Sequence, residues 1–528
     1  KANSMIRITY YLLSIISLIT VAVIQPFWHN ALYLLIIIIP IILLGIYDLR
    51  SHHNILRNYP VIGHIRYAFE FIRPEIQQYF VATNLSGRPF NREQRSLVYQ
   101  RAKNVMDTHP FGTEHNITET GYQYCQHSIN VKTVSADKTF HSVGGPQCTQ
   151  PYRASLINIS AMSYGALSRN AVRALNLGAK LAGIYQNTGE GGLTDHHLSG
   201  GGDIVWQIGT GYFGCRTAGG GFDEKKFVAK AGLDAVKMIE IKISQGAKPS
   251  HGGVLPGDKV SAEIANIRGI PEGQDCLSPP DHSTFNNPIG LLQFIVQLRE
   301  LSGGKPIGFK IAIGIKKEFM GICKAMLESG IYPDFITVDG AEGGTGAAPL
   351  VFTNRLGVPG DEAVAFVHNC LLGCNLRQHI TIIASGKVSN SFHIAKKLAL
   401  GANMVNIARG FMFTIGCIQA IKCNTNECPT GVTSNDPKRY KAIDIQHKSQ
   451  HVKNFHQHTI KSLQELTGAM GLDNPQDHSA DNIYYRINQS ESKTLAELFN
   501  FIAPGNLLSD EIHPTYKAEW EKSRSDAF

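Results

Sequence analysis

Residues 380–410 read ITIIASGKVSNSFHIAKKLALGANMVNIARG, and this stretch decides the fold. It opens with an apolar run rich in β-branched residues, 380–384, which ends in a glycine turn. A stretch of helical period, 393–400, comes next, and a second apolar run, 405–408, follows it. Strand, glycine turn, helix and strand in this order predict parallel strands that are joined by crossover helices.

The same alternation recurs on both sides of this stretch. Apolar runs precede stretches of helical period at 156–159 and 169–181, 307–313 and 317–327, 335–338 and 362–372, and 405–408 and 411–421. Repetition on this scale favours an α/β fold of the (β/α)8 TIM-barrel type, and a doubly wound open sheet is the second candidate.

Polar and glycine-rich groups distinguish these two folds, because they follow many different predicted strands. They are Ser160-Ala161-Met162-Ser163, the segment 187–192, Lys310 within its strand, Asp339-Gly340, Ser385-Gly386-Lys387 and Arg409-Gly410. In a barrel the carboxyl ends of all strands open on one face, whereas an open sheet gathers such groups at one switch point. No GxGxxG motif follows the first strand, which also disfavours the open sheet.

The barrel is predicted at 154–437. A lead-in segment at 51–153 precedes it, and a helical extension at 438–528, with a partly amphipathic helix at 444–470, follows it. The net charge is +8, but no Lys/Arg run with interleaved aromatic residues concentrates it, so we expect no nucleic-acid partner. Ten cysteines in 528 residues are too few for a disulfide scaffold and indicate a reducing compartment.

The amino-terminal segment is exceptionally apolar. Residues 1–4 read as a cloning remnant and are set aside. Two nearly charge-free runs, 8–24 and 31–47, are each about the minimum of 17 residues that can span the hydrocarbon core. We therefore predict a transmembrane helical hairpin at 5–50. The alternatives are a signal peptide followed by one anchor, which lacks a small-residue cleavage site here, and a buried helical hairpin.

Basic residues predict how this hairpin is oriented. Arg7, Arg50 and Arg57 flank its outer ends, and the connecting loop carries no Lys or Arg. The positive-inside rule then places both ends in the cytoplasm. We expect an inner-membrane protein that contacts lipid through the hairpin and whose catalytic domain faces the cytoplasm.

Three cysteines follow the last predicted strand. Cys417, Cys423 and Cys428 have the spacing C-x5-C-x4-C-P, which suits a cuboidal iron–sulfur cluster with three protein ligands on a helix end and the loop behind it. No nearby histidine completes a zinc tetrahedron. The alternative is three unrelated buried thiols, as we expect for Cys370 and Cys374, which stand at helical spacing in an apolar run.

The turns at 385–387 and 409–410 share a second property. Each ends a strand with glycine before a helix, so backbone N–H groups and a helix N-terminus converge where a phosphate could bind. In barrels the usual phosphate pocket follows strands seven and eight. The alternative is two ordinary glycine turns.

Together these motifs resemble a known family. Residues from about 110 to 437 resemble the FMN-binding synthase domain of glutamate synthase, and the whole chain resembles short FMN-binding glutamate synthase family proteins with an N-terminal membrane hairpin. The matching segments occur in order: 110–113 (PFGT), 159–165 (ISAMSYG), 187–192 (NTGEGG), 207–214 (QIGTGYFG), 242–249 (KISQGAKP), 255–257 (LPG), 278–280 (SPP), 339–349 (DGAEGGTGAAP) and the cysteine triplet.

The resemblance implies FMN in the barrel mouth and a [3Fe–4S] cluster on the three cysteines. It implies that Ser160, Ala161, Met162, Ser163 and Gln207 lie along the isoalloxazine, with Lys310 near its N1/O2 edge and Asp339 and Gly340 also at the cofactor. Ser385, Gly386, Lys387, Arg409 and Gly410 would hold the phosphate. The 2-oxoglutarate site of the family maps onto Glu190, Lys248 and Arg268.

These three residue types suit the implied reaction. Arg268 can bind a carboxylate in bidentate form. Glu190 and Lys248 can manage the charge at nitrogen as hydride reaches an imine carbon. The alternatives are a solvated loop lysine for Lys248 and a structural ion pair for Glu190.

One segment departs from the family pattern. The family's Gly-Glu-Gly-Gly-Gln stands here as Ser-His-Gly-Gly-Val at 250–254, so Val254 replaces a substrate-binding glutamine. Loss of a hydrogen-bonding partner can change substrate choice by orders of magnitude. The substrate is therefore the least determined part of the prediction.

Two parts of a complete glutamate synthase are not found in the sequence. It shows neither an amidotransferase domain with an N-terminal cysteine nor an NAD(P)H-binding fingerprint. We expect electrons from a ferredoxin-like or reductase partner, and an amine from solution or from an amidotransferase partner. The predicted function is reduction of an imine of 2-oxoglutarate or a related keto acid, giving L-glutamate. Alternatives are the same scaffold acting on another substrate, or a membrane-tethered electron-transfer subunit.

Overall fold

The computed structural model describes residues 2–528, which form two compact units, and the boundary between the units lies between Gly87 and Arg88. Lys1, the first residue of the predicted cloning remnant at 1–4, lies outside the described residues. The unit boundary falls inside the segment that the sequence assigns to the lead-in.

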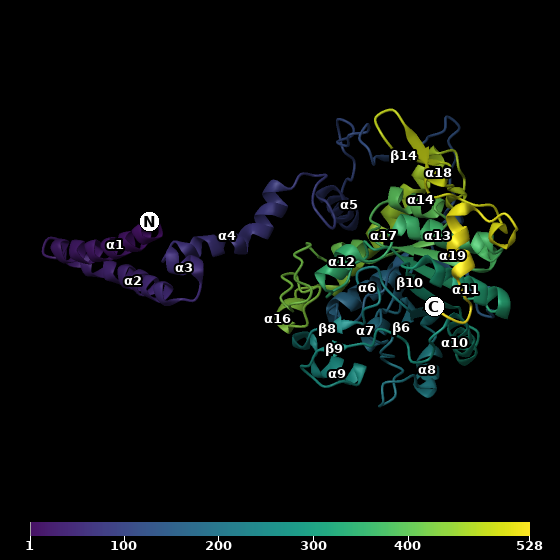
Figure 1. The fold of residues 1–528 in the computed structure, drawn as a ribbon, viewed down its shortest axis with the longest axis horizontal. Helices are drawn as coiled ribbons and strands as arrows, with labels where there is room; N and C mark the ends of the chain where they lie inside the picture. The colour runs from purple at the N-terminus through teal and green to yellow at the C-terminus, as the bar shows by residue number, and fades with distance from the viewer. Residues whose placement is uncertain (1) are drawn as a thin grey trace. The chain divides into compact units, whose positions relative to one another are not determined.

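The first unit is helical (Figure 1). Its elements are α1 (Ala2–Ile24), η1 (His29–Leu34), α2 (Leu35–Arg50), α3 (Asn54–Asn58), α4 (Gly63–Ile76) and η2 (Gln77–Val81). Helices α1 and α2 pack closely, because the ring of Tyr10 occupies the space that a side chain at Gly45 would need. The segments Met5–Ile24 and His29–Arg50 are long and apolar enough to cross a membrane, judged by length and composition.

The second unit contains a closed barrel of eight parallel strands. In chain order they are β4 (Ile157–Ile159), β5 (Tyr185–Asn187), β6 (Asp203–Ile208), β7 (Val236–Lys242), β10 (Ile307–Ala312), β11 (Phe335–Asp339), β12 (Thr381–Ser385) and β13 (Met404–Ile407). The pairing of Val405 with Ile157 joins β13 to β4 and closes the barrel. The predicted (β/α)8 barrel is confirmed, and the open-sheet alternative is wrong.

Crossover helices follow the strands and cover the barrel. They include α6 (Arg169–Ala182), α8 (Glu224–Ala231), α10 (Pro288–Leu301), α11 (Lys316–Ser329), α13 (Gly360–Gly373), α14 (Ser391–Ala399) and α15 (Arg409–Thr414). Their limits follow local chemistry, as α6 shows: the Ser168 side chain caps its first turn, and Gly183, at φ +67°, ends it. The strands are buried on both faces, which explains their unbroken apolar runs.

Two local predictions need correction. The helix expected at 411–421 ends at Thr414, because Gly416, Gln419 and Ile421 have positive φ, which a helix cannot contain. The cysteines therefore lie on a loop and not on a helix end. The pattern of apolar runs and helical stretches does not predict the strands β5, β6 and β7, because glycine-rich segments interrupt that pattern between them.

Short helices and strands lie in the segments that connect the barrel strands and helices. They are α7 (Asp195–Leu198), β8 (Val254–Leu255), η4 (Gly257–Lys259), α9 (Ala262–Arg268), β9 (Cys276–Leu277), α12 (Leu350–Arg355), η5 (Arg377–His379) and α16 (Pro437–Tyr440). Strands β8 and β9 pair antiparallel, and β8 begins at Val254, the residue that replaces the glutamine of the family pattern.

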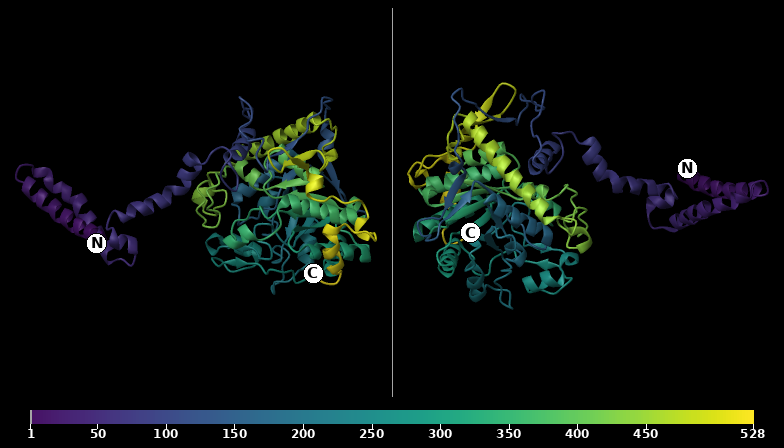
Figure 2. Two further views of the ribbon diagram at one scale, coloured as in Figure 1. Left: turned by 45° about the horizontal axis from the view of Figure 1, so that its top comes forward. Right: turned by 180° about the vertical axis from the view of Figure 1, so that it is seen from behind.

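The flanking segments pack against the barrel from outside. The lead-in supplies α5 (Arg92–Lys103), β1 (Gln123–Cys125), η3 (Ala136–Thr139), β2 (Phe140–Val143) and β3 (Tyr152–Ser155). The extension supplies α17 (Ile445–Ala469), η6 (Pro475–Asp477), β14 (Ile483–Arg486), β15 (Ser492–Thr494), α18 (Leu495–Leu498), η7 (Asn506–Leu508) and α19 (Pro514–Lys522). Helix α17, which confirms the helix predicted at 444–470, runs along α6 and α5 (Figure 2). Strand β1 pairs with β14, so lead-in and extension share one small sheet.

Candidate functional site

A cavity of about 800 Å³ opens at the carboxyl ends of the barrel strands. Every strand of the barrel contributes at least one residue to its lining, from the last three residues of the strand or just beyond its end. In strand order these are Ser160, Glu190, Gln207, Lys242, Lys310, Asp339, Ser385 and Asn406. The volume is within the range of cofactor and substrate sites in proteins, roughly 300–1,000 Å³.

The cavity gathers most residues that the resemblance implies. All of those residues line it except Gly340, Gly410 and Cys428. A Cβ on Gly340 would lie 2.5 Å from the Cα of Gly360, and a Cβ on Gly410 would lie 2.6 Å from the Ile407 side chain. These two glycines therefore permit close packing behind the cavity wall, where no larger residue fits.

Glu190 and Lys242 form a buried ion pair at one side of the cavity. Lys242 Nζ lies 2.6 Å from Glu190 Oε1, and both side chains are largely shielded from solvent. Burial raises the pKa of the Glu190 carboxyl, but the charge of Lys242, with smaller contributions from Lys248 and Arg268, outweighs it and holds the pKa below its usual value. Glu190 is therefore ionised among three cations.

Arg268 is buried beside this pair without an acidic partner. Its Nη2 donates to the carbonyl of Tyr164 at 3.1 Å, and its guanidinium lies 5.1 Å from the ring centroid of Phe213. In the part of the chain that the structure describes, no carboxylate forms an ion pair with Arg268, and its buried Nε has no hydrogen-bond partner. A buried guanidinium with an unused donor is suited to an anionic ligand.

Lys248 also lines this side of the cavity. Its Nζ donates to the carbonyl of Ala347 at 2.9 Å. Burial lowers the pKa of Lys248 to about 8, although the Glu190 carboxylate acts in the opposite direction. A lysine with a pKa near 8 can exchange a proton close to neutral pH, which a solvated loop lysine cannot do.

Sequence reasoning missed Lys242 and a second buried acid, Glu240. Glu240 is almost fully buried on β7 and accepts hydrogen bonds from Gln207 Nε2 (2.6 Å), Thr337 Oγ1 (2.6 Å) and Asn187 Nδ2 (2.9 Å). It thus orients the amide of Gln207 at the cavity floor. The available signal was the pair Glu240 and Lys242, two charged residues spaced by two at the carboxyl end of strand β7, which is apolar apart from these residues and Lys237.

Two positively charged side chains that form no ion pair within the described chain also line the opposite side of the cavity. Arg409 Nη2 donates to the Glu342 carbonyl at 2.6 Å, and its guanidinium lies 4.9 Å from the ring centroid of Phe90. Burial lowers the pKa of Lys387, and the neighbouring charges of Arg409 and Arg88 lower it further. Neither Lys387 nor Arg409 forms an ion pair within the described chain. Gathered positive charge next to the Gly386 turn fits a phosphate.

Lys310 and Asp339 connect the two sides. Lys310 Nζ lies 3.3 Å from Asp339 Oδ2, and the same carboxylate accepts from Ser385 Oγ at 2.7 Å and from the Gly246 N–H at 3.0 Å. Asp339 is fully occupied with these donors. It therefore positions Lys310 and Ser385 at the cavity.

The three cysteines lie on the loop behind Arg409. Cys417 and Cys423 line the cavity, and Cys428 is buried. Burial, with smaller contributions from the other two thiols, raises the pKa of Cys417 to about 12, so the three are within electrostatic reach of one another. Among residues 2–528, no group of three His, Cys, Asp or Glu side chains is arranged closely enough to hold a metal ion. The cluster implied by the resemblance thus stays a prediction.

Lys259 links this loop to the segment between β4 and α6, a contact that the sequence does not predict. Its buried Nζ donates to the carbonyls of Ala166 (2.8 Å) and Cys423 (3.0 Å). The lead-in also contacts the loop, since the amide of Gln419 both donates to and accepts from the backbone of Phe90.

Two solved structures illustrate the low level of structural similarity found. A mandelate oxidase mutant with a monooxide FMN adduct matches 82% of this chain and 99% of its own, with 14% identity and a TM-score of 0.40. A flavocytochrome b2 mutant with benzoylformate gives a TM-score of 0.41 at 12% identity, covering 83% of this chain and 90% of its own.

Sequence comparisons are more informative. Residues 108–473 match the model of the family described as the conserved region in glutamate synthase. The chain is 38% identical over 495 residues to the glutamate synthase large subunit-like protein YerD of Bacillus subtilis, covering 85% of this chain and 94% of that one. It is 36% identical over 317 residues to the archaeal glutamate synthase [NADPH] of Methanocaldococcus jannaschii, covering 60% of this chain and 59% of that one. The family match and the extent of the likeness to YerD show that this chain belongs to the glutamate synthase family of oxidoreductases.

Proposed function

We propose that this chain is an FMN-dependent oxidoreductase that reduces the imine of a 2-oxo acid to the amino acid. The observation that carries the proposal is Arg268, a buried cation without an acid, beside the ionised Glu190 and the low-pKa Lys248. This combination can bind a carboxylate and supply a proton on the same side of the cavity.

These three residues of the cavity have separate roles. Arg268 binds the substrate carboxylate in bidentate form through two of its guanidinium nitrogens. Lys248 Nζ donates the proton that the nitrogen gains as the imine carbon receives its hydride. Glu190, held by Lys242 at 2.6 Å, keeps Lys248 protonated and stabilises the positive charge that develops on the nitrogen as this one proton is transferred. The balance is one hydride to carbon and one proton to nitrogen.

FMN fits the remaining residues of the cavity. Lys387 and Arg409 would hold the phosphate at the Gly386 turn, and Lys310 would lie along the ring system with Ser160 and Gln207. FMN, once reduced, supplies the hydride equivalent. Unpaired cations at one end and oriented amide and lysine donors between the two ends support this assignment.

We also propose that Cys417, Cys423 and Cys428 hold a [3Fe–4S] cluster. The cluster would accept single electrons from a ferredoxin-like or reductase partner. Two of the three cysteines border the same cavity as Arg409, which supports an electron entry on that side. Ammonia would come from solution or from an amidotransferase partner.

Val254 leaves the identity of the 2-oxo acid open. It lines the same cavity as Glu190 and Lys248, at the position where the family pattern has glutamine. An apolar side chain there removes one donor for a second polar group on the substrate. We therefore propose 2-oxoglutarate as the first substrate to test, and an apolar 2-oxo acid on the same scaffold as the second.

Membrane anchoring is part of the same proposal. Both apolar segments are scarcely buried in the described structure, 6% for Met5–Ile24 and 11% for His29–Arg50, which leaves their side chains for lipid. Arg7, Arg50 and Arg57 at the outer ends favour a cytoplasmic location of the barrel at the inner membrane.

Anaerobic reoxidation of the flavin tests the enzymatic proposal. The full chain is reconstituted with FMN, reduced with dithionite and mixed with ammonium or glutamine together with 2-oxoglutarate, pyruvate or a branched 2-oxo acid. We expect reoxidation only when a 2-oxo acid and an amine source are both present, and an amino acid as the product by mass spectrometry. If no acid reoxidises the flavin and only a redox protein does, the chain is an electron-transfer subunit and the proposal is wrong.

A further inference from the structure

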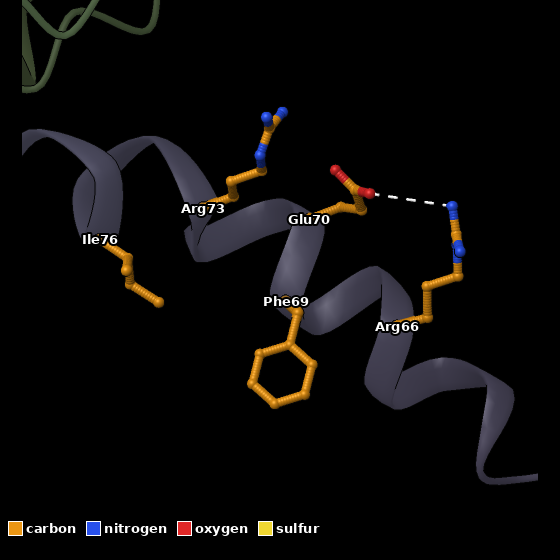
Figure 3. Close-up of a pocket in the computed structure, with 5 residues that line it drawn as sticks. All are labelled: Arg66, Phe69, Glu70, Arg73 and Ile76. Atoms are coloured by element: carbon orange, nitrogen blue, oxygen red, sulfur yellow. Dashed lines mark ion pairs between the residues drawn. The ribbon is translucent and has the colours of Figure 1, made fainter. Parts of the chain in front are cut away.

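Helix α4 carries an apolar face that no other described residue covers. Ile62, Ile65, Phe69, Ile72 and Ile76 recur at helical spacing and are between 38% and 60% exposed. These face residues continue into a shallow hollow, which Phe69 and Ile76 border along one edge and Arg66, Glu70 and Arg73 along the other (Figure 3). A face of this size is normally buried against another surface.

The start of α4 is fixed to the end of the predicted membrane hairpin. Asp48, near the end of α2, is fully buried and accepts from the Val61 N–H at 2.8 Å. His64 Nε2, in the first turn of α4, lies 2.8 Å from Asp48 Oδ1. These contacts hold the first turn of α4 at the level where the apolar segment ends at Arg50.

A second set of contacts fixes the same level on α1. Arg7 Nε donates to the Arg57 carbonyl at 3.0 Å, and Arg7 Nη2 donates to Asn58 Oδ1. Helix α3 is thus tied to the first turns of α1 as well. In both views of Figure 2, α4 leaves this corner in a different direction from the hairpin. It does not continue the line of α2.

Charges near the corner match a phospholipid surface. Within residues 5–87, arginines occupy positions 7, 50, 57, 66 and 73, and the acids are Asp48, Glu70 and Glu75. Asp48 is committed to the buried contacts with Val61 and His64. Exposed guanidinium groups therefore stand beside the apolar face, at the depth where lipid phosphates would lie.

We propose that α4 is an interfacial helix that lies on the lipid surface, with Ile65, Phe69 and Ile72 among the upper acyl chains and Arg66 and Arg73 at the phosphates. This inference rests on the membrane anchoring proposed above. The helix follows the hairpin and precedes the catalytic unit in the chain. Lipid is favoured over a protein as the occupant because the face continues directly from a hairpin whose apolar surface is itself uncovered.

Tryptophan fluorescence in the full chain tests the inference. The chain has three tryptophans, of which Trp206 and Trp520 are buried in the second unit, so Trp28→Phe provides a background without tryptophan in the first unit. Phe69→Trp places a probe on the apolar face. Phe71→Trp is the matched control, since a position two residues on points about 200° further round the helix. Both variants exchange one exposed aromatic residue for another.

The proteins are reconstituted into vesicles of phosphatidylcholine and phosphatidylglycerol with brominated acyl chains. We expect the bromines to quench Phe69→Trp at least about twofold more strongly than Phe71→Trp, because the apolar face of an interfacial helix enters the acyl region. The signal of Phe69→Trp should also shift to the blue relative to the control. An alkaline carbonate wash of the same vesicles reports independently whether the chain is anchored.

The outcomes separate the two proposals. Release of the chain by carbonate would refute anchoring itself. A chain that resists carbonate but shows equal quenching at both positions would refute the interfacial helix and leave anchoring intact. A blue-shifted Phe69→Trp signal that bromine does not quench would show that a protein surface covers the face, and would also overturn the inference.

Discussion

The Glu190→Gln substitution removes one charge from the centre of the proposed chamber. Lys242 Nζ, 2.6 Å from Glu190 Oε1, makes no other hydrogen bond or ion pair within the described chain, so the substitution would leave it only a neutral amide acceptor. Hydrogen bonds to charged groups contribute about 1.5–3 kcal/mol, so we expect the free energy of unfolding to fall by about that amount. Losing a group that supports proton transfer should slow flavin reoxidation about 100-fold or more.

The pH dependence of the same variant is the sharper measurement. Burial lowers the pKa of Lys248 to about 8, and the Glu190 carboxylate limits that fall. Protonated Lys248 is the active form, so activity declines as pH rises through its pKa. Without the carboxylate, the pKa of Lys248 falls further, and the alkaline limb of the pH–rate profile moves to lower pH.

Single-turnover reoxidation of reduced flavin, followed by absorbance from neutral to alkaline pH, provides the profile. Asp203→Asn is the control, because it removes a carboxylate at the first residue of β6, remote from the carboxyl-end cavity. Asp203 accepts from Tyr152 Oη at 2.8 Å, and its loss should leave the alkaline limb in place. A Glu190→Gln enzyme with the wild-type rate and an unmoved limb would refute the roles assigned to Glu190 and Lys248.

Four further substitutions test other parts of the molecule. Asp334→Asn should lower the free energy of unfolding, measured by urea titration, by about 3–5 kcal/mol, because the buried Arg299 would lose the carboxylate that lies 3.0 Å from its Nη2. A loss under about 1 kcal/mol would contradict this. Arg409→Gln should weaken FMN binding, measured by quenching of flavin fluorescence, at least about tenfold through loss of a charge-assisted contact; unchanged affinity would exclude the phosphate site. Val254→Gln should shift kcat/KM towards 2-oxoglutarate and away from apolar 2-oxo acids, and an unchanged ratio would mean that this position does not select the substrate. Cys423→Ser should abolish bound iron and labile sulfide while FMN remains, whereas Cys370→Ser, in the core, should leave iron unchanged; equal iron in both would refute the cluster.

Local pattern was sufficient for much of the fold. The runs at 380–384 and 405–408 became β12 and β13 to within one residue at each end, because unbroken apolar runs and period-3.6 patterns can be read directly from neighbouring residues. The same logic placed α6 and α17. It failed at 411–421, where positive φ at Gln419 and Ile421 ends any helix although the side chains alone resemble one. Backbone conformations of this kind are set by the loop's contacts with other segments.

Sequence by itself also determined which residue types could bind an anion, a phosphate or a metal. It could not show that Lys242 holds Glu190, or that Glu240 orients Gln207, because these partners are 52 and 33 positions apart. Nor could it reveal that Arg268 is buried without an acid, since that property depends on every neighbour at once. Closure of the barrel brings the eight strand ends to one face, and only this tertiary event turns scattered polar residues into a chamber with shifted pKa values.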